Sequence, residues 1–180
     1  MEKWDLYDRE GRLLSRTINR GARFRSGEYH LVTHVWVVNS AGRVLIQRRS
    51  AKRRMMPNIW AVTSGSAVAG EDSATAARRE LAEELGIRLA PEAFQLLGRL
   101  VRRNSLCDVY LVKRDIAVPD MKLQKEEVSQ VRWVTGEQLF AMINERRFHH
   151  YGDPYFRFVA EGIRRETGVA LLGEDVSHAD

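Results

Sequence analysis

Glu80, Glu83 and Glu84 are residues whose type and spacing permit metal chemistry in this chain of 180 residues. Residues three and four positions apart lie on the same side of a helix, so the three carboxylates would form one stripe. Like charges at that spacing destabilise a helix by about 0.2–0.5 kcal/mol per pair. Clustered oxygen ligands suit Mg²⁺ or Mn²⁺, and a bound cation offsets the repulsion. The stripe predicts a divalent-metal site, and its alternative is an ordinary solvated helix face.

Two neighbouring residues are suited to hold this stripe in place. Arg79 directly precedes Glu80 and can form an ion pair with Glu71, which would fix the preceding loop to the helix. Gly65 has no side chain, so the backbone can approach the site closely there.

The whole string from Gly65 to Ile87 follows one pattern. It reads glycine, five residues, glutamate, seven residues, Arg-Glu, an aliphatic residue, any residue, Glu-Glu, any residue, glycine and an aliphatic residue. This is the Nudix box without a substitution. The chain resembles the Nudix hydrolase family over roughly residues 28 to 140.

The resemblance implies a Nudix-like α/β/α sandwich around a mixed β-sheet, with the box as a loop–helix–loop. It also implies Mg²⁺- or Mn²⁺-dependent hydrolysis of a nucleoside diphosphate linked to another moiety. Carried over position by position, the resemblance implies metal ligands at Glu80, Glu83 and Glu84. It implies structural roles for Gly65, Glu71 and Arg79.

The general base is expected from one of two places. The first is the box itself, at Glu83 or Glu84. The second is the loop at residues 123–128, where Glu127 and Glu126 are the candidates. The other interpretation of these loop acids is that both are simply solvated.

Segments between residues 29 and 60 resemble the branch of the family that contains isopentenyl diphosphate isomerase. That enzyme uses a cysteine just before the box and a histidine two residues later, where this chain has Ser64 and Ser66. Of its two histidines ahead of the first core strand, only His30 matches, and Arg23 stands at the other position. We therefore expect hydrolysis. An isomerase-like enzyme and a non-catalytic nucleotide-binding Nudix domain are the alternatives.

Three residues before the box are candidates for binding substrate. Arg48 belongs to a basic cluster, and a guanidinium can hold a phosphate at two points. Because Arg48 and Arg49 point to opposite faces of a strand, at most one of them faces the site. His30 and Trp36 share a strand face with His34 and can contact a phosphate or a base. The alternatives are a solvated charged segment for Arg48, a hydrogen-bond network or partial exposure for His30, and a place in the core for Trp36.

Charge is divided unevenly along the chain. The formal net charge is +5, with 24 arginines and five lysines. Residues 71–84 carry a local charge of −3, whereas residues 43–54 carry +6. An acidic stripe beside arginines fits a small diphosphate substrate. Nucleic acid is not expected as a partner, because it requires a broad basic face with interleaved aromatic residues.

Targeting signals and disulfides are not expected. The single cysteine, Cys107, cannot form an internal disulfide. The N-terminal residues lack the apolar stretch of a signal peptide, and no apolar run approaches the length of a membrane span. We therefore predict a cytoplasmic protein with no membrane partner.

The pattern of strands, one helix, strands and then helices predicts an α+β layered fold. We expect a single domain over residues 1–180, with a hairpin at 1–20 and a core at about 28–140. The C-terminal helices, within 136–167, can pack on the core, close the pocket or form a homodimer interface. Further strands are expected at 30–38 and 44–49 as a hairpin, and at 60–64, 94–103, 106–113 and 131–134. Helices are expected at 72–85, 136–146 and 154–165.

Overall fold

A computed structural model describes residues 1–171, and residues 172–180 of the expected domain lie outside the described part. Its strands are β1 (Lys3–Tyr7), β2 (Leu13–Asn19), β3 (His30–Val38), β4 (Val44–Arg49), β5 (Trp60–Ala61), β6 (Thr63–Ser66), β7 (Gln95–Val101), β8 (Ser105–Lys113) and β9 (Val128–Val134). Its α-helices are α1 (Ser73–Leu85), α2 (Gly136–Asn144) and α3 (Asp153–Thr167), and its short 3₁₀ turns are η1 (Pro91–Ala93) and η2 (Val118–Asp120).

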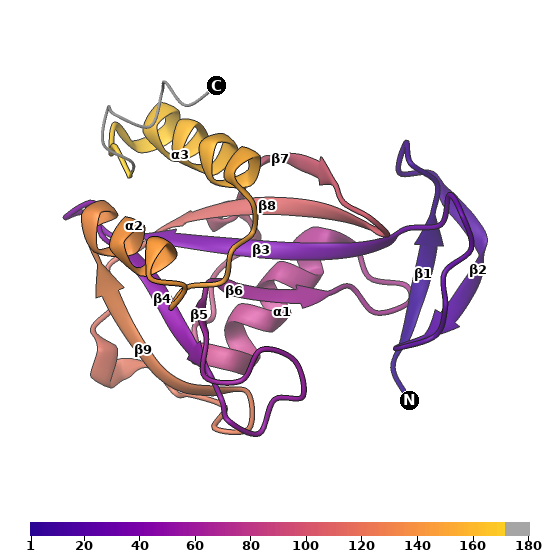
Figure 1. Cartoon of the computed structure of the whole chain (residues 1–180), viewed down its shortest axis with the longest axis horizontal. Helices are drawn as coiled ribbons and strands as arrows, with labels where there is room; N and C mark the ends of the chain where they lie inside the picture. Colours follow the sequence, from indigo (N-terminus) through magenta and orange to yellow (C-terminus); the bar gives the residue numbers. More distant parts are fainter. Residues whose placement is uncertain (172–180) are drawn as a thin grey trace.

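The large sheet is mixed, with the main strand order β5-β4-β3-β8-β7 (Figure 1). Parallel pairing joins β3 to β8 along their whole length, from His30 opposite Ser105 to Val38 opposite Lys113. The remaining pairs are antiparallel, with β9 on β4 and β6 on β3. The predicted mixed sheet is therefore confirmed.

The expected hairpin of β3 and β4 is reduced to one pair, Val38 opposite Val44. The edge of β3 between Val32 and Val35 pairs with β6 instead. Because one edge cannot serve two partners, β4 diverges from β3 and pairs with β9 and β5. The segment that carries β5 and β6 lies between the diverging strands, with β5 paired to β4 and β6 paired to β3.

Side chains alternate between the two faces of the sheet, and each face has its own core. The face that packs on α1 holds Val35, Val37, Leu45, Tyr110 and Val112. The face that packs on α2 and α3 holds Trp36, Val38, Ile46, Val109 and Leu111. Figure 1 shows α1 on the side of the sheet opposite α2 and α3. The α/β/α layering predicted from the box is confirmed.

The position of α1 is fixed at both ends. Asp72 caps its first turn by accepting a hydrogen bond from the Thr75 amide at 2.7 Å. At the other end, Gly86 adopts the left-handed conformation, with φ of 72°. Ser73 also bonds to buried Asp108 of β8, which accepts two hydrogen bonds from Arg99 at 2.6 and 2.8 Å. The helix is thus tied to the centre of the sheet.

A separate two-stranded sheet, β1 and β2, lies at one end of the molecule (Figure 1). Its residues Trp4, Leu6 and Ile18 form a small core of their own. It also holds the loop before α1, because the Ala69 amide donates to the Lys3 carbonyl at 2.8 Å and the Gly70 amide to Asp5 at 2.7 Å. The hairpin therefore supports one side of the candidate site.

Candidate functional site

Arg79 connects the loop and the helix of the box. Its Nε and Nη2 donate to the two carboxylate oxygens of Glu71 at 2.8 and 2.9 Å, and Nη2 also donates to the Ser66 carbonyl at 3.1 Å. Burial alone would raise the pKa of Glu71, but the hydrogen bonds from Arg79 and from the Val68 amide outweigh it and lower that pKa. This bidentate contact is the geometry that makes Arg–carboxylate pairs strong and directional.

The three glutamates of the stripe differ in exposure. The Glu84 residue is 4% exposed, the Glu80 side chain is 16% exposed, and the Glu83 side chain is 55% exposed. Arg79 Nη1 donates to Glu80 at 2.8 Å and to Glu83 at 3.3 Å. The stripe therefore runs from the interior to the surface, and an evenly solvated helix face does not describe it.

Glu84 is the most strongly perturbed of these carboxylates. Its Oε2 accepts a hydrogen bond from Gln47 Nε2 of β4 at 2.6 Å. Burial raises the pKa of Glu84 to about 7, against the opposing effect of that hydrogen bond. Burial likewise raises the pKa of Glu80, which Arg79 opposes. Carboxylates whose charge is disfavoured in this way are typical of functional sites.

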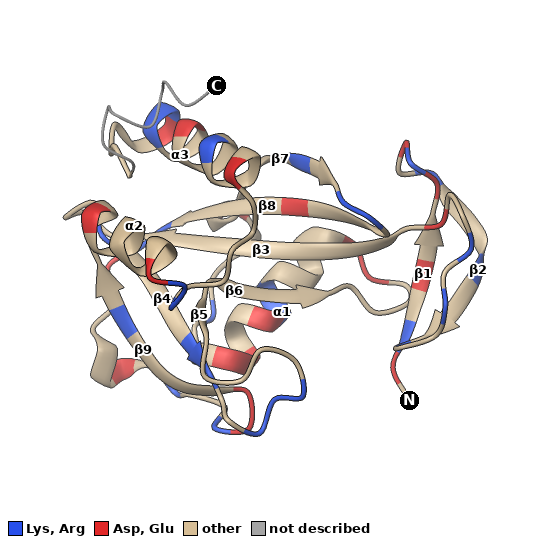
Figure 2. Ribbon diagram, in the orientation of Figure 1, with Lys and Arg blue, Asp and Glu red and all other residues tan. Residues whose placement is uncertain are grey.

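The carboxylates lie in a cleft of about 330 Å³ between α1, the loop after β4 and the loop before β9. We call this space the carboxylate cleft. It is lined by Glu2, Arg20, Val32, Arg49, Arg53, Met55, Met56, Ser64, Gly65, Ser66, Arg79, Glu80, Glu83, Glu84, Gln124 and Glu127. Figure 2 shows the red positions of α1 and the blue positions of the loop after β4 at the same end of the molecule. Acids and arginines thus line one space.

The two loop acids occupy different surroundings. Glu127 lines the carboxylate cleft and forms an ion pair with Arg53. The side chain of Glu126 is 69% exposed, lies outside the cleft lining and has Lys52 at 3.8 Å. Of the two loop acids considered as a general base, only Glu127 lines the cleft that holds the stripe.

Arg48, predicted to bind substrate, lies outside the cleft, and Arg49 takes that place. The two residues point to opposite faces of β4, as strand alternation requires. Arg49 shares its face with Gln47 and with Leu45, which packs against α1. Arg48 is directed the other way, and its Nε donates to the Asn58 carbonyl at 3.1 Å. Of the pair, the structure therefore places Arg49, and not the predicted Arg48, at the carboxylate cleft.

His30 and Trp36, also predicted to bind substrate, are not brought to the carboxylate cleft. The His30 ring stacks on Trp4 of the N-terminal hairpin at 4.2 Å between centroids. Trp36 is 1% exposed, and its Nε1 donates to the Tyr155 hydroxyl of α3 at 2.9 Å. Both rings serve packing, because the hairpin and α3 cover the two ends of that face of β3.

A smaller pocket of about 200 Å³ opens beside the cleft, and we call it the inner pocket. It is lined by Val32, His34, Arg49, Met56, Ala61, Ser64, Arg102, Ser105, Cys107, His149 and Tyr151. Most of these residues come from β3, β8 and the segment before α3. Their convergence depends on pairing between distant strands, so the local sequence pattern carried no signal for it beyond the position of His34.

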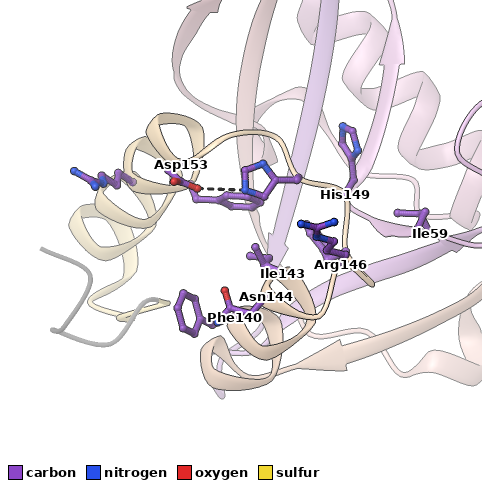
Figure 3. A pocket seen from close by; sticks show the side chains of 11 residues that line it. Ile59, Phe140, Ile143, Asn144, Arg146, His149 and Asp153 are labelled. Atoms are coloured by element: carbon purple, nitrogen blue, oxygen red, sulfur yellow. Dashed lines mark ion pairs between the residues drawn. The ribbon is translucent and has the colours of Figure 1, made fainter. Parts of the chain in front are cut away.

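A larger cavity, about 770 Å³, lies elsewhere, between α2 and the start of α3 (Figure 3). Ile143 and Phe140 of α2 contribute to its mainly apolar lining, and none of the box glutamates does. His150 and Asp153 form an ion pair in it at 3.3 Å, drawn as the dashed line in Figure 3. The size of this cavity therefore does not make it the candidate active site, since the box glutamates lie in the carboxylate cleft.

Comparison with known proteins matches the chain to the NUDIX domain over residues 28–156. An uncharacterized Nudix hydrolase of Listeria monocytogenes is 38% identical over 152 residues, which is 84% of this chain and 90% of that protein. Nudix hydrolase 3 of Arabidopsis thaliana is 35% identical over 152 residues, covering 76% of this chain and 20% of the plant protein.

Solved structures agree with these matches. A crystal structure from Deinococcus radiodurans has a TM-score of 0.71 and 26% identity, and covers 91% of this chain and 98% of that one. A MutT protein from Methanosarcina mazei has a TM-score of 0.58 and 21% identity, covering 77% of this chain and 95% of its own, and shows the shared fold. Within residues 1–171, no helix is both long and apolar enough to cross a membrane.

Proposed function

Because this chain belongs to the Nudix hydrolase family, we propose that it hydrolyses the diphosphate linkage of a small nucleotide-type substrate with the help of Mg²⁺ or Mn²⁺. The substrate class is a nucleoside diphosphate linked to another moiety. The observation that carries the proposal is the pairing of buried Glu84 with half-buried Glu80, in a cleft that also holds Arg49 and Arg53.

The chemistry of the donor set fits a hard divalent cation. Glu80 and Glu84 would hold it, with Glu83 at the exposed end of the stripe. Within residues 1–171, no three acidic, histidine or cysteine side chains converge tightly enough to enclose an ion. Arg79 and Gln47 now occupy oxygens of Glu80 and Glu84, so a cation would replace these hydrogen bonds. When bound, the cation neutralises phosphate oxygens and acidifies a water.

The chain itself supplies binding, orientation and a proton acceptor. Arg49 and Arg53 lie across the cleft from the stripe and are suited to grip the diphosphate oxygens. Glu127, beside Arg53, is positioned to accept the proton of an attacking water. The Arg79–Glu71 pair holds the loop of residues 66–71 against α1. This contact fixes the position of the glutamate stripe relative to the loop.

The decisive experiment is Glu84→Gln, assayed by metal-dependent phosphate or nucleotide release. Turnover should fall by orders of magnitude, because the substitution removes the charge but preserves the shape. The fold should survive, since the amide oxygen can still accept from Gln47 and a neutral group is easier to bury. We expect Tm to stay equal or to rise. Unchanged turnover would overturn the metal assignment.

The substrate screen should include nucleoside phosphates, dinucleoside polyphosphates, sugar nucleotides and isopentenyl diphosphate, each with Mg²⁺ and Mn²⁺. EDTA should abolish release, and added metal should restore it. Formation of the dimethylallyl isomer would favour the isomerase alternative, which Ser64 and Ser66 argue against. Tight nucleotide binding without hydrolysis would favour a non-catalytic domain.

Glu127→Gln tests the proton acceptor, and Glu126→Gln is its matched control. Both changes remove one carboxylate from the same loop, but only Glu127 lines the cleft. We expect a fall in kcat for Glu127→Gln of about 10²–10⁴-fold, the range of general-base catalysis. The Glu126→Gln variant should retain wild-type kcat. Equal activity of the two variants would remove Glu127 from the mechanism.

A further inference from the structure

The inner pocket lies directly beside the carboxylate cleft. Val32, Arg49, Met56 and Ser64 line both spaces. A group attached to a diphosphate in the cleft would therefore lie next to the inner pocket, with Arg49 in contact with both spaces. The two spaces together form one site with an acidic end and a second end of different chemistry.

Two arginines give the inner pocket its charge, because no aspartate or glutamate lines it. Arg49 is 8% exposed, and its Nε and Nη2 donate to the Met55 carbonyl at 3.2 and 3.1 Å. Within residues 1–171, neither Arg49 nor Arg102 forms an ion pair with a carboxylate. A largely buried guanidinium with no carboxylate in direct contact is costly, so an anionic ligand beside Arg49 would stabilise this arrangement.

His34 adds a neutral hydrogen-bond donor of fixed direction. Trp36 Nε1 can only donate, and it donates to the Tyr155 hydroxyl at 2.9 Å. The one proton of Tyr155 is then available to His34 Nδ1, which lies 2.7 Å away. His34 consequently carries its own proton on Nε2. Burial, followed by the charge of Arg102, lowers the pKa of His34 to about 3, so the ring remains neutral.

Tyr151 supplies a further polar group. The residue is 5% exposed, and its hydroxyl has no partner at hydrogen-bond geometry within the described chain. The Val62 amide lies near enough to influence the pKa of the phenol, but burial dominates and raises that pKa. The hydroxyl therefore stays protonated and can donate to a ligand in the pocket.

We propose that the inner pocket binds a phosphate group of the substrate, next to the diphosphate held in the carboxylate cleft. Donors from arginine, histidine and tyrosine with no acidic residue suit an anion rich in acceptor oxygens. The volume of about 200 Å³ is below the 300–1,000 Å³ typical of sites for whole drug-sized ligands, so a small group fits better than a nucleoside. The link to a diphosphate rests on the proposed function, whereas phosphate binding does not.

Titration with inorganic phosphate in the absence of divalent metal tests the pocket alone. Without metal, the glutamates disfavour phosphate in the cleft. Because Arg49 and Arg53 also line the cleft, binding is assigned to the inner pocket by its loss in Arg102→Met. Arg102→Met should raise the Kd for phosphate at least tenfold, as measured by calorimetry. Arg103→Met is the control, because Arg103 is exposed and lies outside the pocket lining. Tyr151→Phe removes one hydroxyl and should weaken binding by a smaller factor.

Three results would overturn the proposal. They are no saturable phosphate binding by the wild type, equal affinity of Arg102→Met, and tighter binding of acetate than of phosphate. Thermal melting of each variant shows whether it is folded. Should Arg102→Met fail to fold, Tyr151→Phe decides the question by the same criterion.

Kinetics connect the pocket to the substrate. The ratio of kcat/KM for a nucleoside triphosphate over the corresponding diphosphate should fall about tenfold in Arg102→Met and stay constant in Arg103→Met. An unchanged kcat/KM ratio in Arg102→Met would show that the inner pocket does not bind a phosphate of the substrate. If the wild type cleaves no diphosphate at all, the proposed function fails, while the phosphate titration still decides the pocket.

Discussion

The substitution Gly65→Ala should displace the carboxylate of Glu80 and leave the stability of the fold nearly unchanged. A Cβ at residue 65 would lie 2.0 Å from Cδ and Oε1 of Glu80 and 2.5 Å from its Cγ. Ordinary contact begins at 3.4 Å, so Glu80 must withdraw by more than about 1 Å. A misplacement of that size costs about 10²-fold in rate. We therefore expect kcat/KM to fall about 100-fold.

The expected cost in stability is small. The φ of Gly65 lies outside the left-handed region, so alanine causes no backbone strain there. The clashing atoms belong to a flexible side chain that can turn away. Glu80 would lose its contact with Arg79, a partly exposed ion pair worth about 1 kcal/mol or less. A loss of that size lowers Tm by about 2–4 °C in a chain of this length.

Gly70→Ala should produce the opposite pattern and serves as the control. Gly70 has a φ of +85°, which disfavours alanine, and no atom lies within 4 Å of a Cβ added there. The variant should lose about 1–2 kcal/mol of stability and keep its kcat/KM. The assay is Mg²⁺-dependent release of product from the best substrate, alongside a thermal melt. Wild-type kcat/KM and an unchanged Mg²⁺ requirement in Gly65→Ala would refute the role of Glu80.

Two further changes act on stability. Asp108→Asn removes the buried charge that accepts from Arg99, and should cost about 2 kcal/mol, less than a fully buried pair because the Arg99 side chain is 38% exposed. A melt should show Tm lowered by about 4–8 °C, and an unchanged Tm would contradict this anchor. Acidification is the second change, because burial lowers the pKa of His30 to about 4 and of His34 to about 3. Below pH 6.5 the unfolded chain binds protons that the folded rings resist, so stability present above pH 6.5 is lost as the pH falls. Each histidine should remove about 1.4 kcal/mol between pH 7.5 and 5.5. Protonation of Glu84, whose pKa is raised to about 7, stabilises the fold over the same range, so the loss is measured in Glu84→Gln, and equal Tm of that variant at pH 7.5 and 5.5 would contradict this.

Local patterns in the sequence predicted the elements and the box helix well. The spacing of Glu80 and Glu84 placed them on one stripe, and Asp72 and Gly86 mark where α1 begins and ends. These features depend on neighbours within a few residues. Local spacing therefore contained the information needed for the carboxylate side of the site.

The other side of the cleft depends on contacts between distant segments. Strand alternation separated Arg48 from Arg49, but only the packing of Leu45 against α1 decides which of them faces the glutamates. Burial of His30 depends on Trp4 in another sheet. Such information was absent from the local pattern, although Leu45 could have indicated the correct face.

The parallel pairing of β3 with β8 has a consequence for how the protein folds. His30 lies opposite Ser105, so the strands that flank α1 in sequence must close a long loop before they pair. Topologies dominated by such distant contacts fold more slowly than those built from local ones. Asp108 and Tyr110 of β8 also hold the start of α1 through Ser73. During synthesis, the glutamate stripe can therefore reach its final place only after β8 has left the ribosome.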